Sequence, residues 1–199
     1  MRWIGGGSGA AKTSVAAALA ARFGLRGYST DAAIPPHAAA AGPDTPLLAT
    51  WLQMSMDERW LLRDPVEMVH TFPWFAGERF DRIVADLSSA PTTPLTVAEG
   101  FRLLPRLVAP LLVEPWQAIW LVPTPDFRRW VFARRPLEQQ FWLRTSDPSA
   151  AFERLLARDQ MFTDCVSDEA AGLGLRVVVV DASSSEAALA EEVARWFRL

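Results

Sequence analysis

Short apolar runs alternate along the chain with longer segments that favour helices. The apolar runs cover Arg2–Gly5, Leu25–Thr30, Leu95–Ala98, Ile119–Val122 and Arg176–Val180. They are apolar on both faces and do not alternate with polar residues, which is typical of strands in a parallel sheet covered by helices on both sides. The pattern therefore predicts a three-layer α/β fold with one parallel sheet.

Helices are predicted between these runs from propensity and from apolar residues recurring at helical spacing, such as Phe80, Ile83, Val84 and Leu87. The expected helices cover 13–23, 47–63, 65–70, 75–88, 125–134, 149–160, 163–172 and 185–198. Two stretches are predicted to be loops instead: the Pro-rich segment 32–46 and the segment 136–148.

Length, charge and cysteine content limit the possible functions. A chain of 199 residues suits one domain, so we expect a single domain over 1–199. The net charge of −3 provides no basic field for nucleic acid. We expect no membrane span and no leader peptide. The lone Cys165 suits a reducing compartment, so the expected localisation is cytoplasmic, as a monomer or homodimer.

One residue stands out in the composition. The chain has no Asn and 19 Arg but only one Lys, which is Lys12. An ammonium group is a compact charge on a flexible stem, whereas a guanidinium is planar and larger. We interpret Lys12 as a position where only the ammonium would serve.

Lys12 lies in a glycine-rich segment that follows a predicted strand and opens a predicted helix. The predicted phosphate-binding residues are Gly6, Gly7, Ser8, Gly9, Ala10, Ala11, Lys12, Thr13 and Ser14. In such a loop the backbone N–H groups and the helix N-terminus bind phosphate oxygens, while the Lys reaches the β- and γ-phosphates and the following Thr binds Mg²⁺. A plain glycine-rich turn with an exposed Lys is the alternative.

Ala11 departs from the G-x-x-x-x-G-K-[ST] pattern, because it stands where the last Gly is expected. A methyl group there would be unfavourable at positive φ. Backbone at the start of a helix normally has negative φ, so we expect Ala to be tolerated.

The chain resembles the P-loop kinase group that includes nucleoside monophosphate kinases, shikimate and gluconate kinases and chloramphenicol phosphotransferase. The loop at 5–14 is the most specific likeness. Tyr28-Ser29-Thr30-Asp31 is similar to the strand end that carries the group's acidic residue, and Thr96–Gly100 to the strand that ends beside the γ-phosphate. The resemblance implies a sheet ordered 2-3-1-4-5, an acceptor-binding insertion at about 32–75 and a lid at about 135–148.

The resemblance also implies roles for residues beyond the loop. Arg134 and Arg135 are similar to the arginine pair that precedes the lid, Arg154 and Arg158 to phosphate-contacting arginines on the next helix, and Asp181 to the strand end that passes the adenine. Arg134 and Arg135 would then stabilise the transition state, unless Arg134 stacks on adenine instead. Each of these arginines, like Arg144, can equally be a solvated surface residue.

Two carboxylates end predicted strands, where open α/β sheets bind ligands. Asp31 is the expected base that orients the acceptor hydroxyl, and Glu99 the expected ligand of Mg²⁺ or of the acceptor. Asp31 can otherwise cap a turn, and Glu99 can be structural. Asp86 is a competing Mg²⁺ ligand, but its surroundings have helical spacing, so we expect it to be solvated.

An aromatic cluster marks the predicted insertion: Trp51, Trp60, Phe72, Trp74 and Phe75. It would suit a bulky, partly apolar acceptor, although ordinary core packing explains each residue alone.

Taken together, the sequence predicts a kinase that transfers the γ-phosphoryl group of Mg-ATP to a hydroxyl of a small metabolite, nucleoside or antibiotic. Two alternatives stay open. One is a nucleotide-dependent protein that sequesters a drug without transferring phosphate. The other is a nucleoside monophosphate kinase, which would need Arg59, Arg63 or Arg79 to hold the acceptor phosphate.

Overall fold

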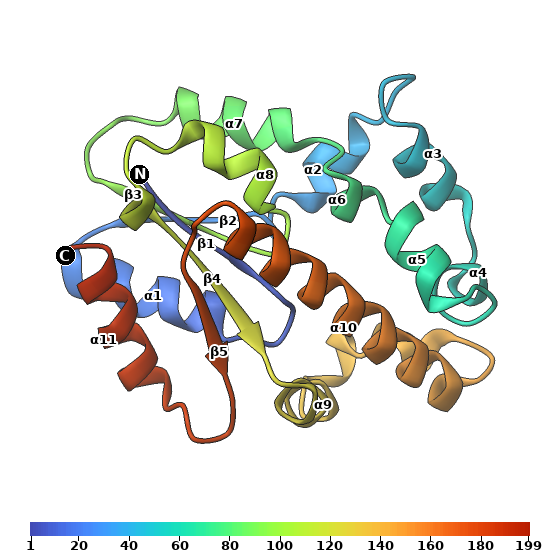
Figure 1. Cartoon of the computed structure of the whole chain (residues 1–199). Coiled ribbons are helices and arrows are strands. Elements are labelled where there is room, and N and C mark those ends of the chain that lie inside the picture. Colours follow the sequence, from blue (N-terminus) through green and yellow to red (C-terminus); the bar gives the residue numbers. More distant parts are fainter.

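The computed structural model describes residues 1–199 and contains one sheet of five parallel strands. The strands are β1 (Arg2–Gly6), β2 (Arg26–Ser29), β3 (Thr96–Glu99), β4 (Ala118–Pro123) and β5 (Val177–Val180). Their order is β2-β3-β1-β4-β5 (Figure 1). All five predicted strands, the α/β class and the strand order are therefore confirmed.

Eleven α-helices and four short 3₁₀ turns surround the sheet. The helices are α1 (Lys12–Phe23), α2 (Ile34–Ala39), α3 (Pro46–Gln53), α4 (Met56–Trp60), α5 (Pro65–Thr71), α6 (Pro73–Ala76), α7 (Phe80–Ser89), α8 (Pro105–Val108), α9 (Pro125–Ala133), α10 (Pro148–Gly172) and α11 (Glu186–Trp196). The 3₁₀ turns cover Ala109–Leu111, Pro115–Gln117, Leu137–Gln139 and Phe141–Arg144. None of the helices has the length and apolar character needed to cross a membrane.

The structure differs from the sequence-based prediction of loops and helices in four places. The predicted loop 32–46 contains α2, because its prolines stand in the first turn, where a missing N–H costs nothing. The predicted helix 75–88 is broken at Gly77 and Arg79, both at positive φ. The predicted helix 47–63 is split into α3 and α4. Conversely, the two helices predicted over 149–172 are one helix, α10, since no Gly or Pro interrupts them.

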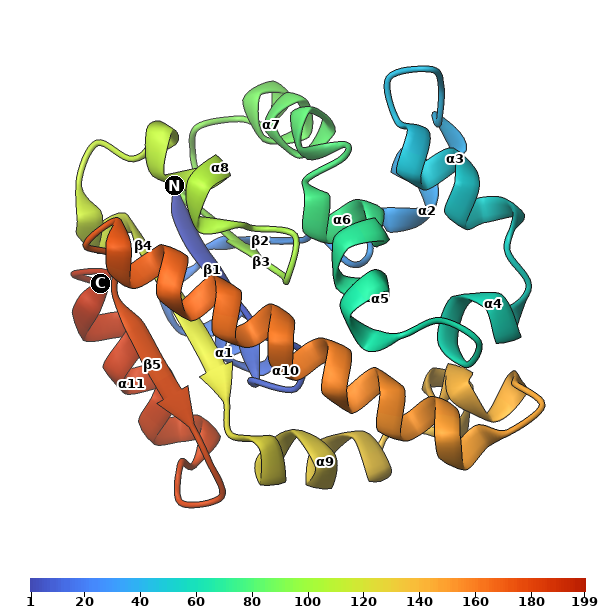
Figure 2. The same cartoon turned by 45° about the vertical axis from the view of Figure 1, so that its right-hand side comes forward.

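Alternate residues of the central strands face two different cores. Trp3 and Trp120 belong to a core rich in aromatic side chains, whereas their neighbours Ile4 and Ile119 belong to a smaller aliphatic core. The long helix α10 covers the aromatic side, and α1 and α11 pack together on the other side (Figure 2). The molecule therefore has three layers.

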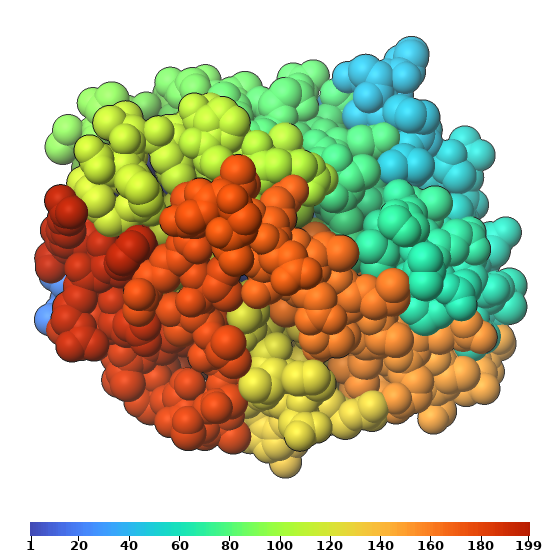
Figure 3. All heavy atoms as spheres, viewed as in Figure 1, coloured from blue at the N-terminus to red at the C-terminus, as the bar shows by residue number.

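The connection from β2 to β3 carries α2 to α7 and projects beyond the sheet. α5 packs against α10, so this insertion is joined to the body of the protein (Figures 2 and 3). Because all strands are parallel, the segments that follow them meet at one edge of the sheet. Residues 7–11, Asp31, Glu99 and Gly100 gather there.

Candidate functional site

The loop between β1 and α1 curls tightly against β4. Gly6 has φ 121°, and a Cβ atom at this position would lie 1.9 Å from the Leu121 carbonyl oxygen. Gly9 also has positive φ, at 85°. The glycines are therefore required by backbone conformation and close approach, as the sequence predicts.

The backbone N–H groups of residues 8–14 donate no well-formed hydrogen bond to the protein. They border a cavity of about 310 Å³, called here the loop cavity, which is also lined by Asp31, Glu99 and Arg135. A run of unpaired N–H groups at the start of a helix presents several donors and a partial positive charge to a common point. This arrangement is suited to bind an anion with several oxygen atoms.

Ala11 lies at the start of α1 with φ 57° and ψ 19°, in the left-handed region. The expectation of negative φ was therefore wrong. The chain reverses its direction sharply at Ala11, just before α1 begins. This reversal requires positive φ, which is the reason that Gly is usual at this position of the motif. The left-handed conformation costs a non-glycine residue about 1–2 kcal/mol.

Lys12 is buried, with 7% of its surface exposed, so the alternative of an exposed Lys is wrong. Its Nζ donates a hydrogen bond of 2.7 Å to the Gly7 carbonyl oxygen and thereby folds back over the loop. Burial lowers the pKa of the Lys12 ammonium, while the nearby carboxylates of Asp31 and Glu99 oppose that shift. An anion in the loop cavity would supply the negative charge that favours the ammonium form.

Thr13 and Glu99 meet across the sheet edge. The Thr13 hydroxyl donates to Glu99 Oε2 at 3.2 Å. Glu99 is 3% exposed, and its Oε1 has no hydrogen-bond partner. A buried carboxylate oxygen without a partner is costly unless a cation or water completes the site.

These two oxygen ligands fit Mg²⁺, which keeps several waters and usually takes only one or two carboxylates from the protein. The protein contains no cluster of three or more His, Cys, Asp or Glu side chains that would hold a metal alone. Most ligands of an ion at Thr13 and Glu99 would therefore come from water or from a bound phosphate.

Asp31 follows β2 and lines both the loop cavity and a second cavity described below. Its Oδ1 accepts a long hydrogen bond of 3.4 Å from the Thr30 hydroxyl. The surrounding walls remove part of its hydration and so raise the pKa of the Asp31 carboxyl; the charge of Lys12 opposes that shift. A carboxylate with a raised pKa is a better proton acceptor.

A chain of polar groups that runs from the interior to the surface supports this strand end, and sequence reasoning missed it. Arg102, which is 2% exposed, donates to the Thr30 carbonyl oxygen at 3.1 Å and lies 3.1 Å from His37 Nδ1. His37 Nε2 in turn lies 2.9 Å from Asp86 Oδ2, which also accepts from the Tyr28 hydroxyl at 2.7 Å.

Asp86 lies on α7 with 46% of its side chain exposed, so the expectation of a helical, solvated residue is confirmed; its carboxylate also accepts a hydrogen bond from Tyr28 and lies beside His37. His37 and Arg102 are far apart in sequence, so no motif could signal their contact.

The second cavity, called here the aromatic cavity, measures about 260 Å³ and lies between the insertion, α10 and the residues after α9. It contains the five aromatic residues predicted to cluster, together with Phe101 and Phe141. Trp60 packs on Phe141 with ring centroids 4.5 Å apart, and Phe72 on Phe75 at 4.7 Å. The two cavities share Ser8, Asp31, Phe101 and Arg135, so a molecule in one can contact a molecule in the other.

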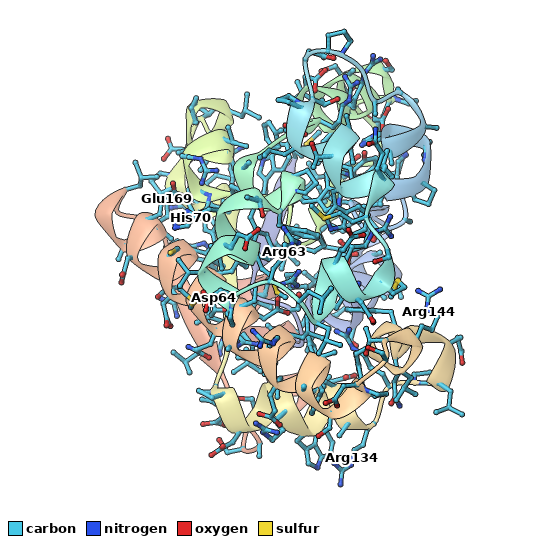
Figure 4. All side chains as sticks on the ribbon, turned by 90° about the vertical axis from the view of Figure 1, so that its right-hand side faces the viewer. Arg63, Asp64, His70, Arg134, Arg144 and Glu169 are labelled. Carbon is cyan, nitrogen blue, oxygen red and sulfur yellow. The ribbon has the colours of Figure 1, made fainter.

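The predicted arginines differ in position. Arg135 lies over the Phe132 ring at 3.9 Å, and its guanidinium forms no hydrogen bond with the protein. Arg158 lies in the aromatic cavity. Arg154 donates to the Arg63 carbonyl oxygen and lines neither cavity. Arg144 is exposed near the 3₁₀ turns of the predicted lid (Figure 4).

Arg134 lies beside a third cavity of about 370 Å³ between α9 and the segment after β5, called here the α9 cavity. Its guanidinium lies 4.4 Å from the ring centre of Trp130, which is stacked on Phe127. Its side chain extends from the end of α9 toward solvent (Figure 4). Trp130 is 52% exposed and offers a flat apolar surface.

Asp181 does not line the α9 cavity. Its Oδ1 accepts hydrogen bonds from the Ser183 backbone N–H and hydroxyl, which lower the pKa of the exposed Asp181 carboxyl and form a turn. The neighbouring Val180 and Ser184 face the cavity instead. The predicted strand end is therefore at the cavity, but the Asp181 side chain points elsewhere.

Arg128 is a further residue that sequence reasoning missed. It is 1% exposed and donates to the Ser8 carbonyl oxygen, to Gln160 Oε1 at 2.8 Å and to the Thr163 hydroxyl. It therefore links the loop to α10. The adjacent Arg129 is half-exposed, so the sequence alone offers no signal that separates the two.

No protein-family profile matches this chain, and no curated protein is significantly similar to it in sequence. Inference about its function therefore depends on the chemistry of these three adjoining cavities.

Proposed function

We propose that this protein is an ATP-dependent kinase of small hydroxylated molecules, with a phosphate-binding loop at residues 6–13. The observation that carries the proposal is the set of unpaired N–H groups of residues 8–14, with the buried Lys12 beside them. Backbone donors and a single ammonium group at the start of a helix are the means by which such loops bind the β- and γ-phosphates.

The residues around the loop suit the other parts of Mg-ATP. The Thr13 hydroxyl and the unpartnered Glu99 Oε1 would hold Mg²⁺. When bound, Mg²⁺ supplies positive charge that offsets the negative charge on the phosphoryl group. The α9 cavity, with Trp130 and Arg134, suits a planar base by its size and flat apolar wall.

In the proposed reaction, the acceptor hydroxyl oxygen forms a bond to the γ-phosphorus while the bond to the β–γ bridging oxygen breaks, and ADP leaves. The hydroxyl proton passes to the Asp31 carboxylate, which lies between the two cavities that would hold the reactants. The unpaired Arg135 guanidinium faces both cavities and stabilises charge on the transferring group. Positioning and electrostatics thus provide most of the rate.

The test is to incubate the purified protein with Mg-ATP and a library of hydroxylated compounds, and to detect ADP and phosphorylated products by mass spectrometry. We expect at least one acceptor to gain one phosphoryl group. A protein that only sequesters its ligand would bind ATP, measured by calorimetry, but would transfer phosphate to no compound. Absence of Mg-ATP binding would overturn the proposal altogether.

A further inference from the structure

The insertion contains four arginines, and each contacts another group of the protein. Arg59 donates to the Trp51 and Leu52 carbonyl oxygens and lies 4.0 Å from the Trp51 ring centre. Arg63 donates to the Glu58 and Arg59 carbonyl oxygens and to the Thr71 hydroxyl.

Arg79 is buried and pairs with Asp44 and the Ala40 carbonyl oxygen. None of these three arginines lines the aromatic cavity. The exposed Arg82 lies 3.7 Å from Asp81 and does not line the aromatic cavity. The insertion therefore has no free cation to bind an acceptor phosphate.

The charged groups inside the aromatic cavity compensate one another. Arg158 and Asp159 are 5% and 2% exposed, and Arg158 Nε donates to Asp159 Oδ1 at 2.8 Å. The Arg158 guanidinium also lies 4.7–5.0 Å from the ring centres of Trp60, Phe72 and Phe75. This ion pair brings no net charge to the cavity wall.

The remaining charges stand where the aromatic cavity meets the loop cavity. Asp31 and Arg135 line both cavities. Of the four charged residues in the aromatic cavity, Arg135 is the only one whose side chain has no hydrogen-bond partner in the protein. In the proposed reaction Arg135 faces the phosphates of ATP. The two guanidinium groups and two carboxylates of the cavity wall sum to zero charge. An anionic acceptor would therefore meet aromatic rings and no net positive charge to repay its desolvation.

We propose that the acceptor is an uncharged molecule with a planar apolar ring and a hydroxyl group, and that the aromatic cavity rejects phosphorylated or carboxylated analogues. The role of the hydroxyl group in this inference rests on the proposed kinase function. The preference of the aromatic cavity for uncharged ring compounds does not. The ring packs among Trp60, Phe72 and Phe141. The hydroxyl lies toward Asp31, at the boundary with the loop cavity.

The test uses matched ring alcohols that differ only in charge. The probes are 2-(4-methylphenyl)ethanol, 4-(2-hydroxyethyl)benzoate and the cationic 4-(2-hydroxyethyl)benzylamine. Binding to the full chain, without nucleotide, is followed by saturation-transfer NMR and tryptophan fluorescence. We expect the neutral probe to bind at least about tenfold more tightly than the carboxylate. Equal or tighter binding of the carboxylate overturns the inference, and so does tighter binding of the amine.

The Arg158–Asp159 ion pair allows a more specific test of the charge preference of the aromatic cavity. Asp159→Asn leaves the Arg158 charge uncompensated, so the affinity of the carboxylate probe relative to the neutral probe should rise about tenfold. Asp168→Asn is the matched control, because Asp168 is exposed on the same helix, and it should leave the ratio unchanged. An unchanged ratio in a folded Asp159→Asn protein contradicts the inference. If that variant does not fold, the wild-type probe series still decides.

Failure of the kinase proposal has a different signature. Selective binding of the neutral probe with no phosphoryl transfer to any ring alcohol would reject the kinase and keep the cavity assignment. Phosphorylation of nucleoside monophosphates in preference to nucleosides would support the kinase proposal and reject the cavity assignment.

Discussion

The loop cavity and the aromatic cavity adjoin each other but are built in different ways. The first is lined mainly by seven consecutive residues, 8–14, whose backbone N–H groups are unpaired, with Glu99, Asp31 and Arg135 added at its rim. The second is lined by residues scattered over α2, α3, α4, α6, α9 and α10 and the segments between them. A contiguous motif can keep its ligand chemistry constant, whereas scattered side chains can change with the acceptor.

The largest effect is expected from a variant that removes the only ammonium group of the loop. Lys12→Ala should lower ATP-dependent turnover by about 10³-fold or more, because no other cation lies within the loop to replace it. Turnover is measured by ADP release, and circular dichroism should show an intact fold. Arg195→Ala, on exposed α11 surface, is the control and should keep full activity. Near wild-type turnover in Lys12→Ala would reject the phosphate-binding loop.

A second variant tests Asp31, the carboxylate at the boundary of the two cavities. Asp31→Asn should leave ATP affinity nearly unchanged in calorimetry but lower phosphoryl transfer by about 10²–10⁴-fold, the usual effect of losing a positioned base. The amide keeps the shape of the carboxylate, so a lower rate reports chemistry. A variant that transfers phosphate at the wild-type rate would shift the role of base to Glu99.

A third variant tests whether the aromatic cavity binds the acceptor independently of ATP binding in the loop cavity. Trp60→Leu removes ring surface that faces Phe72, Phe141 and Arg158, so the KM for a ring-bearing acceptor should rise about tenfold while ATP affinity stays constant. Trp196→Leu on α11 is the matched control, since it loses a similar surface away from the cavities. A parallel loss of ATP affinity in Trp60→Leu would show that the two cavities are not independent.

A smaller effect concerns pH and stability. The Asp31 pKa is raised in the folded protein, so its ionised form is disfavoured by folding. The contribution of Asp31 to the stability of the wild-type protein should therefore fall as pH rises from below 3.8, the ordinary value, through the raised pKa. Asp31→Asn lacks this penalty and should melt at a higher temperature than wild type at pH 7, with the difference vanishing below about pH 3.5. Melting curves at several pH values would reveal the sign.

The smallest expected effect is at Ala11. Ala11→Gly should keep or modestly improve ATP binding, by about threefold at most, and should stabilise the fold by about 1 kcal/mol, because Gly adopts the left-handed conformation without strain. Calorimetry and thermal unfolding measure the two quantities. A tenfold loss of affinity would mean that the Ala11 methyl group packs against the bound nucleotide.

The strands, their parallel arrangement and the loop could be predicted from the residues alone, because these features depend on local information. The continuous apolar runs mark buried strands, and the glycines with Lys12 and Thr13 mark the loop within nine residues. It also placed Asp31 and Glu99 correctly at strand ends, since every strand of a parallel sheet ends at the same edge.

Which side chains meet could be learned only from the three-dimensional packing. Arg135 is unpaired beside the loop and Arg154 is tied to a carbonyl oxygen, although both looked alike in the sequence. The buried His37 and Arg102 and the half-exposed Asp86 form one network from three distant segments. The left-handed Ala11 depends on how the chain turns into α1. Such outcomes follow from packing and from the pairing of buried polar groups, which are long-range properties that local residue patterns do not record.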